Sequence, residues 1–146
     1  MTIRRANTGD LDAVAVLFDS YRRFYRLTGD LEGGRRFLRD RIEGNECVIF
    51  VAFEDGKAVG FTQLYPSFSS GAMARIFVLN DLFVAPEARR SGVGSALLRT
   101  AAEFGRAEGA ARLVLSTELT NTIAQSVYEK NGWKRDTVFC VYQLAL

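Results

Sequence analysis

Apolar residues recur at two different spacings along this chain of 146 residues. Where they return every three or four positions they predict amphipathic helices, and the helices begin near Leu11, Leu31, Val93 and Thr122. Shorter apolar runs between turn-forming residues predict strands. These runs cover residues 3–6, 48–53, 57–65, 73–84, 112–116 and 138–144.

The order of these elements is β-α-α-β-β-β-α-β-α-β, which predicts an α/β (α+β) fold. Asp55-Gly56 predicts a hairpin turn, and Pro66 with Ser69-Ser70-Gly71 predicts a second one. The strand–helix–strand unit between Leu82 and Leu115 is a crossover, so its two strands are expected to lie parallel. We therefore expect a single domain over residues 1–146 with a mixed central sheet of about six to seven strands.

Composition removes several classes of function. With 48% hydrophobic and 25% charged residues the chain reads as globular, and a net charge of +2 gives no argument for a nucleic-acid partner. No apolar run reaches the roughly 20 residues that span a bilayer, so no membrane association is expected. Cys47 and Cys140 lie in apolar runs, and we interpret them as buried thiols of a protein in the reducing cytoplasm.

The absence of histidine restricts the chemistry further. Ser-His-Asp and Cys-His catalysis are excluded, and two isolated cysteines do not suggest a metal site. Any proton transfer must use a carboxylate, Tyr, Lys, Cys or water.

The candidate chemistry gathers where a strand meets a helix. The strand formers Leu82-Phe83-Val84 are stopped by Pro86, and Arg89-Arg90-Ser91-Gly92-Val93-Gly94 leads into the third predicted helix. A helix N-terminus carries free N–H groups and a partial positive charge, so two adjacent arginines would complete an anion site suited to phosphate. The alternative is an ordinary strand-to-helix turn with surface arginines.

The pattern Arg89-x-x-Gly92-x-Gly94 resembles the pyrophosphate motif of the GNAT acyltransferases, which bind acetyl-coenzyme A. A second signature of that family follows in 121–133, with Asn121, Ala124, Tyr128 and Gly132-Trp133 at the family's spacing. The element order also matches the GNAT order over essentially the whole chain. Within the family the stretch 79–84 looks like the small HPA-type acetyltransferases; the diamine acetyltransferases have glutamate where this chain has Asn80.

The resemblance implies an acetyl-CoA-dependent N-acetyltransferase that moves an acetyl group to a primary amine by direct attack in a ternary complex, without a metal. It also implies a sheet splayed between the fourth and fifth strands, where a backbone N–H could stabilise the oxyanion. The acceptor stays open among small amines, amino acids and protein amines. The alternative function is a non-catalytic module that binds acyl-CoA. The residues expected to bind acetyl-CoA are Leu82, Phe83, Val84, Arg89, Arg90, Ser91, Gly92, Val93, Gly94, Ser95, Asn121, Ala124 and Tyr128.

Two residues are candidates for catalysis. The resemblance implies that Tyr128 protonates the departing thiolate; the alternative is a core tyrosine. A general base would be useful because an amine with a pKa of ~10.4 is mostly protonated at neutral pH. Asp81 is the first candidate for that base, through a water, with Glu118 or water alone as alternatives; Asp81 could instead be structural.

Two further segments each allow two interpretations. Residues 22–41 carry seven arginines among the aromatic residues of 21–37. They could form a basic wall beside a substrate pocket, or a solvated helix face above core aromatics. The apolar run 138–144 is expected to be a final buried strand, which either pairs in a homodimer or lies inside one sheet.

Overall fold

The structure is a computed structural model that describes residues 1–146, and the chain divides into two compact units, Met1–Ser116 and Thr117–Leu146. The second unit contains one helix, α4 (Thr122–Lys130). The elements of the first unit are β1 (Thr2–Arg5), η1 (Thr8–Asp10), α1 (Leu11–Phe24), α2 (Leu31–Glu43), β2 (Val48–Glu54), β3 (Lys57–Ser69), β4 (Ala74–Val84), η2 (Pro86–Ala88), α3 (Val93–Ala107) and β5 (Leu113–Val114). None of the helices is long and apolar enough to cross a bilayer.

The sheet of the first unit has five strands in the order β1-β2-β3-β4-β5. The first four run antiparallel to their neighbours, whereas β4 and β5 are parallel, with Phe77 opposite Leu113. The predicted mixed sheet and parallel crossover are therefore confirmed. The predicted count of six to seven strands is wrong, because the chain forms five.

The missing strand is the C-terminal run 138–144. Its apolar side chains are exposed, including Val138 at 81% and Tyr142 at 92%, and its backbone pairs with no strand. Asp136 Oδ1 instead accepts hydrogen bonds from the Val138 and Phe139 amides and makes a turn there. An apolar run marks a possible strand, but a strand also needs a neighbour to satisfy its backbone groups. The expected burial of Cys140 fails with the strand, since Cys140 is exposed while Cys47 is buried.

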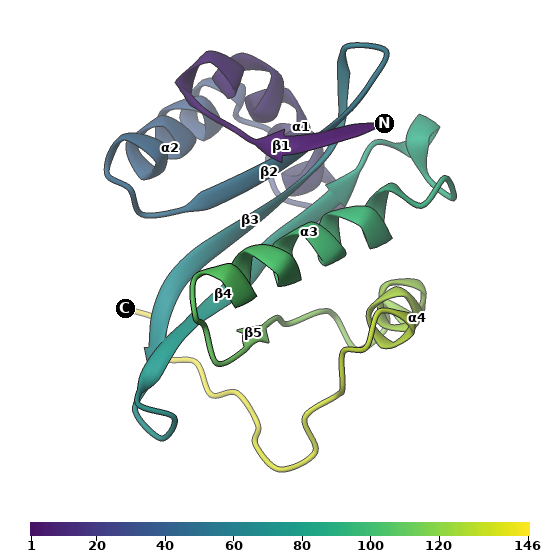
Figure 1. Cartoon of the computed structure of the whole chain (residues 1–146). Helices are drawn as coiled ribbons and strands as arrows, with labels where there is room; N and C mark the ends of the chain where they lie inside the picture. The colour runs from purple at the N-terminus through teal and green to yellow at the C-terminus, as the bar shows by residue number, and fades with distance from the viewer. The chain divides into compact units, whose positions relative to one another are not determined.

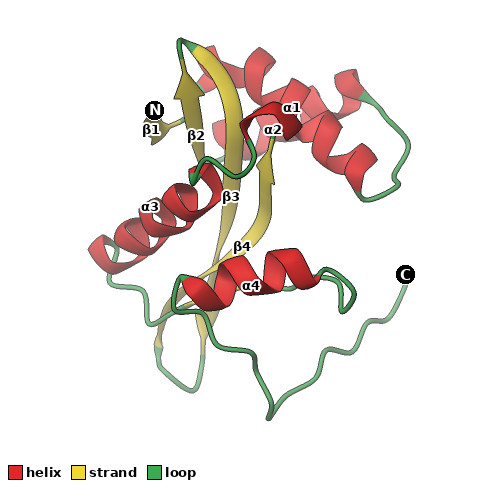
Figure 2. Cartoon of the chain, turned by 90° about the vertical axis from the view of Figure 1, so that its right-hand side faces the viewer, coloured by secondary structure: helices red, strands yellow, loops and turns green.

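Helices cover both faces of the sheet in the first unit. Figures 1 and 2 show α3 on one face and α1 with α2 on the other. Side chains alternate accordingly along β2: Ile49 and Val51 join the core cluster of α1 and α2, whereas the Phe50 ring lies 5.6 Å from the Phe104 ring of α3. This two-sided burial explains why the strands read as continuous apolar runs.

Gly60 allows α3 to approach the sheet closely. A Cβ at this position would lie 3.0 Å from the carbonyl oxygen of Phe83 and 3.2 Å from Val93 Cγ1. Because real Cβ atoms rarely stand so near their neighbours, a side chain here would push the start of α3 away from β3.

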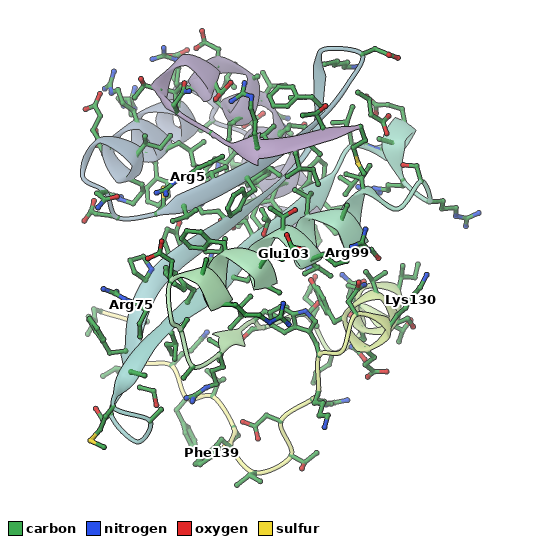
Figure 3. All side chains as sticks on the ribbon, viewed as in Figure 1. Arg5, Arg75, Arg99, Glu103, Lys130 and Phe139 are labelled. Atoms are coloured by element: carbon green, nitrogen blue, oxygen red, sulfur yellow. The ribbon has the colours of Figure 1, made fainter.

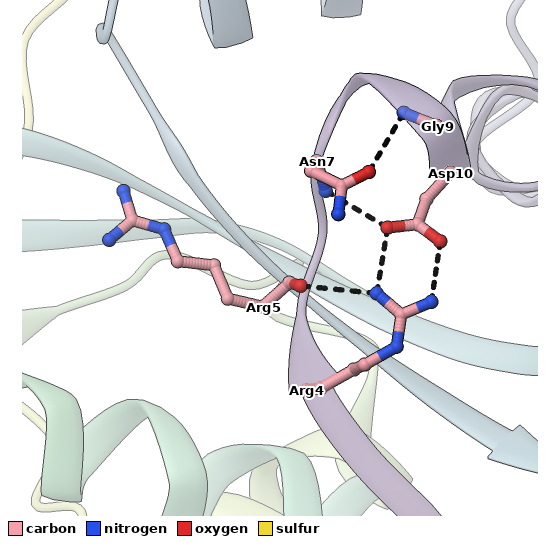
Figure 4. Close-up of polar contacts among 5 residues, drawn as sticks. All are labelled: Arg4, Arg5, Asn7, Gly9 and Asp10. Carbon is pink, nitrogen blue, oxygen red and sulfur yellow. Dashed lines mark hydrogen bonds and ion pairs between the residues drawn. The ribbon is translucent and has the colours of Figure 1, made fainter.

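Polar contacts fix the chain between β1 and α1 (Figure 4). Arg4 makes two parallel hydrogen bonds to the Asp10 carboxylate, at 2.8 and 2.7 Å. Asn7 accepts from the Gly9 amide at 2.8 Å and donates its own amide to Asp10 at 2.9 Å, which is a reciprocal capping box. The Arg4 guanidinium, aided by the Asn7 amide, holds the pKa of Asp10 below its usual value.

Pro66 lies inside β3, opposite Phe77, rather than in the predicted turn. The pairing of β2 with β3 ends at Leu64, so Pro66 has β4 on one side only. Its missing N–H therefore leaves no ladder bond unmade, which is the condition under which proline is tolerated in a strand. The turn itself falls at the tip of the hairpin, where the Met73 amide donates to the Ser70 carbonyl at 3.2 Å.

Candidate functional site

The loop between β4 and α3 is held by its own polar contacts. Arg89 Nε donates to the Val84 carbonyl at 2.9 Å, and Ser91 Oγ donates to the Ala88 carbonyl at 2.5 Å. The short helix η2 begins with Pro86, which supplies no N–H where none is needed. The loop thus has a defined shape at the end of β4.

The N-terminus of α3 is open to a ligand. Its N-cap residue, Gly92, has φ +85°, a left-handed conformation that favours glycine, and no side chain caps the helix. A Cβ on Gly92 would meet no atom within 4 Å, and one on Gly94 would meet only Val84 Cγ2, at 3.8 Å. The first amides of a helix have no acceptor within it and carry its positive dipole end, so this end can bind an anion.

Two exposed arginines stand beside this helix end. The Arg89 guanidinium lies 5.4 Å from the ring centre of Phe24 on α1 and 5.5 Å from that of Phe83 on β4. Stacking on two rings orients the Arg89 side chain while leaving it exposed. Arg90 is also exposed and adopts φ +65°, which is uncommon for a residue with a side chain. The residues present are therefore suited to a pyrophosphate.

β4 is irregular just before the loop. Gln63 of β3 pairs with Asp81, whereas Leu64 pairs with Leu79, so Asn80 is an extra residue, a β-bulge. β5 pairs with β4 only at Phe77 and Val78. The stretch 79–84 therefore has β3 on one side and no strand on the other. The pairing of β4 with β5 ends before the stretch where the family resemblance implies that the sheet opens.

Asp81 is a buried carboxyl with polar partners. It is 3% exposed, and Gln63 Nε2 donates to its Oδ2 at 2.6 Å while Asn80 Nδ2 lies 3.3 Å from its Oδ1. Burial raises the pKa of Asp81 above its usual value, although hydrogen bonds from Gln63, Tyr21 and Asn80 oppose the rise. A carboxyl whose pKa lies above the normal range is better matched to proton transfer near neutrality.

The second unit carries the other predicted residues. Asn121 Oδ1 accepts from the Ala124 amide at 3.2 Å and so caps the start of α4. Tyr128 is half-buried, its ring centre 6.2 Å from that of Trp133, and its carbonyl accepts from the Trp133 amide at 3.1 Å. The signature residues Asn121, Ala124, Tyr128 and Trp133 thus hold α4 and the turn after it together.

Three of the arginines in residues 22–41 are already paired. Arg23 contacts Asp19, Arg35 contacts Asp12 and Arg41 contacts Glu46, all within 2.9 Å. Among the aromatic residues, Tyr21 packs against Phe61 of the core, whereas Phe24 is 49% exposed and Phe37, which stacks on Phe18, is 39% exposed. For the three paired arginines the arrangement favours the solvated helix face.

Sequence reasoning missed Gln63. It is fully buried and contacts the candidate base, yet it lies 18 positions before Asp81. The available signal was a polar Thr62-Gln63 pair inside an otherwise apolar strand. In the whole chain, no group of three or more His, Cys, Asp or Glu side chains is placed to hold a metal ion.

Comparison with known proteins agrees with this geometry. The model of the acetyltransferase (GNAT) family matches residues 14–133. An uncharacterized N-acetyltransferase of Bacillus subtilis (strain 168), YhfO, is 51% identical over 144 residues, covering 99% of this chain and 97% of that protein. The crystal structure of a probable acetyltransferase superposes with a TM-score of 0.95 at 42% identity, covering 100% of this chain and 98% of that one. An aminoglycoside N-acetyltransferase solved in complex with CoA shares the fold at 21% identity, with a TM-score of 0.84, covering 99% of this chain and 95% of that one.

Proposed function

This chain belongs to the GNAT family and is an N-acetyltransferase, and we propose that it transfers the acetyl group of acetyl-CoA directly to a primary amine in a ternary complex. The observation that carries the proposal is the open N-terminus of α3, with Gly92 in a left-handed conformation and two exposed arginines beside it. We further propose that the two units act as one acetyltransferase domain, since the family match spans both.

Acetyl-CoA is proposed to bind along the end of β4 and the loop that follows. The pyrophosphate would accept hydrogen bonds from the loop and first-turn amides of 91–95 and from Arg89 and Arg90. Leu82, Phe83 and Val84 would bind the thioester arm through their backbone, on the side where β4 has no strand neighbour. Asn121, Ala124 and Tyr128 complete the proposed set.

The reaction needs one bond made, one broken and two protons moved. The amine nitrogen attacks the thioester carbon, and a backbone N–H of residues 82–84 stabilises the oxyanion of the tetrahedral intermediate. The amine gives a proton to Asp81, through a water, and the C–S bond breaks. The thiolate takes a proton from Tyr128, so that the products are an amide and a free thiol.

Asp81 is preferred to Glu118 as the base. Burial raises the pKa of Asp81, whereas Glu118 is an exposed carboxyl. A base with a raised pKa removes a proton from an amine more readily than an ordinary carboxylate does.

The test is a screen for release of free CoA thiol from acetyl-CoA in the presence of amines, including small amines, amino acids and protein N-terminal peptides. We expect wild type to turn over at least one amine class.

Arg89→Ala should weaken binding of acetyl-CoA, measured as a smaller rise in melting temperature. Arg99→Ala is the matched control, because Arg99 is an exposed arginine of α3 outside the loop. If acetyl-CoA raised the melting temperature of both variants equally, Arg89 would not be part of the binding site. If wild type bound acetyl-CoA but acetylated no amine, a non-catalytic acyl-CoA module would be favoured.

Tyr128→Phe tests the proposed acid. The variant keeps the ring that packs near Trp133 but loses the phenol proton. General acid catalysis typically contributes about 10²–10⁴-fold, so kcat should fall by roughly that factor while acetyl-CoA binding stays near normal. Unchanged kcat would show that another group protonates the thiolate.

We also propose a homodimer. The apolar side chains of the run 138–144 are exposed, including Phe139 at 79% (Figure 3), and an exposed apolar segment marks a site where another chain can associate. A second copy is the proposed partner, so light scattering at micromolar concentration should give twice the monomer mass. A monomer mass would reject this association.

The free thiols Cys47 and Cys140 agree with a reducing, cytoplasmic location, which we propose as well.

A further inference from the structure

Gln63, the buried partner of Asp81, has a hydrogen bond on only one of its two polar side-chain atoms. Gln63 is fully buried, and its Nε2 donates to Asp81 Oδ2 at 2.6 Å. Its other polar atom, Oε1, is buried without any hydrogen-bond partner. Buried acceptors are normally satisfied, so an orphan beside a candidate base requires an explanation.

The side-chain amide of glutamine offers a donor and an acceptor on the same carbon. An ionised carboxylate only accepts hydrogen bonds, whereas a protonated carboxyl also donates one. Rotation of the amide by half a turn would exchange its NH₂ and its oxygen in front of Asp81. Gln63 can therefore hydrogen-bond to Asp81 in both protonation states. It uses Nε2 when Asp81 is ionised and Oε1, which otherwise has no partner, when Asp81 is protonated.

We propose that Gln63 is the positioning residue of Asp81: its Nε2 donates to the ionised carboxylate and its Oε1 accepts from the protonated carboxyl, so that Asp81 can gain and lose a proton inside the sheet. The pairing stands on the geometry alone. Its consequence for catalysis rests on the proposed function, in which Asp81 accepts the proton of the amine.

Other titratable groups surround this pair. Tyr21 on α1 hydrogen-bonds to Asp81, Tyr65 on β3 interacts with both residues of the pair, and Cys47 before β2 interacts with Asp81. One step further out, Arg41 on α2, Arg5 on β1 and Glu46 act on Cys47. Burial raises the pKa of Cys47 to about 11 and also raises that of Tyr65, so both stay neutral at neutral pH. Arg41 is paired with Glu46 at 2.9 Å. Among the buried groups of this set, Asp81 is therefore the one whose charge is expected to change as pH rises from acid to neutral.

The test compares Gln63→Met with Thr62→Val. Methionine has similar length and no N–H, so the variant removes the donor with little change in packing. Thr62 is the matched control: it is equally buried and donates to Asp81 as well, but to its backbone carbonyl, at 2.8 Å. The midpoint of Asp81 titration is followed by carbon-13 NMR of the carboxyl carbon in each protein.

We expect Gln63→Met to raise the Asp81 midpoint by about one pH unit, because the hydrogen bond lost from the ionised carboxylate is stronger than the neutral one lost from the protonated carboxyl. Thr62→Val should leave the midpoint within a few tenths of a unit. Equal midpoints in wild type and Gln63→Met would overturn the proposal.

A measurement on the wild-type protein covers the case in which Gln63→Met does not fold. The side-chain NH₂ resonances of Gln63 should shift with the same midpoint as the Asp81 carboxyl, and the shift should vanish in Asp81→Asn. NH₂ resonances that ignore the titration would overturn the proposal.

The catalytic consequence is tested with acetyl-CoA and the amine that reacts fastest in the screen. In a plot of kcat against pH, the rise on the acid side should move to higher pH in Gln63→Met by the same amount as the NMR midpoint of Asp81. If the midpoint moves and this rise does not, the pairing is supported and Asp81 is rejected as the base. These results separate a failure of the inference from a failure of the proposed function.

Discussion

Replacing each of two glycines by alanine should affect the stability of the fold in opposite directions and binding in the same direction. Gly92 has φ +85°, whereas Gly94 lies in the first turn of α3 with no left-handed conformation. A left-handed conformation costs a residue with a side chain about 1–2 kcal/mol. Alanine at a helical position stabilises by about 0.4–1 kcal/mol relative to glycine, because the unfolded chain loses freedom.

Neither substitution disturbs neighbouring atoms, so these backbone effects should dominate. A Cβ on Gly92 has open space, and one on Gly94 makes an ordinary contact with Val84 Cγ2 at 3.8 Å. The free energies of unfolding of the two variants should therefore differ by about 2 kcal/mol, with Gly94→Ala the more stable. With a urea m-value of about 2 kcal/mol/M this corresponds to midpoints about 1 M apart.

Binding gives the second half of the test. If the pyrophosphate approaches the backbone at the start of α3, a methyl group at either position stands in its way. Both variants should then bind acetyl-CoA about tenfold more weakly by calorimetry, a loss of about 1.4 kcal/mol. Normal binding by the more stable Gly94→Ala would refute close approach at that residue, and unchanged stability of Gly92→Ala would refute the left-handed conformation.

Three further predictions concern the core, the first turn and the thiols. Leu97 is fully buried, so Leu97→Ala should lower the free energy of unfolding by about 2–5 kcal/mol in urea denaturation. The lowered pKa of Asp10 means that its carboxylate stabilises the fold above the unfolded value of ~3.9 and that this contribution disappears as pH falls through the folded value. Arg4→Met should thus lose stability at about pH 7 but little at about pH 2, and an equal loss at both would argue against the ion pair. In the monomer a thiol reagent should label exposed Cys140 and spare Cys47, whose pKa burial raises to about 11, so Cys140→Ser should abolish labelling of the folded monomer by mass spectrometry.

Elements with local signals were predictable from the sequence. The helix α4 runs over the predicted residues Thr122–Lys130, because Asn121 caps its start and Gly132 follows its end in a left-handed conformation. The turn at Asp55-Gly56 is found where the sequence places it, with both residues at positive φ. The strand-to-helix loop 89–94 is likewise a local feature, marked by its glycines and arginines before a helix, and its binding of an anion stays a prediction.

Features that depend on pairing between distant segments were not predictable. The position of Pro66 in β3 depends on where β2 stops, and the fate of residues 138–144 depends on whether a neighbouring strand exists. Gln63 and Asp81 meet only because of the register between β3 and β4. A sequence records the polarity of each position but not the position that will lie opposite it.

The bulge at Asn80 decides which face of the sheet carries the carboxyl. Before the bulge, the odd-numbered residues of β4 point toward α3, as the Phe77 ring does at 5.1 Å from the Phe104 ring. After the bulge, the odd-numbered Phe83 belongs to the opposite core, where its ring lies 6.5 Å from the Tyr21 ring of α1. One extra residue shifts the alternation by one, so Asp81 lies with Gln63 and Tyr21 on the α1 face. If Asn80 were paired regularly instead of bulged, the unbroken alternation would direct the Asp81 carboxyl into the apolar layer beneath α3, where burial would hold it protonated and away from the aromatic side chains of α1.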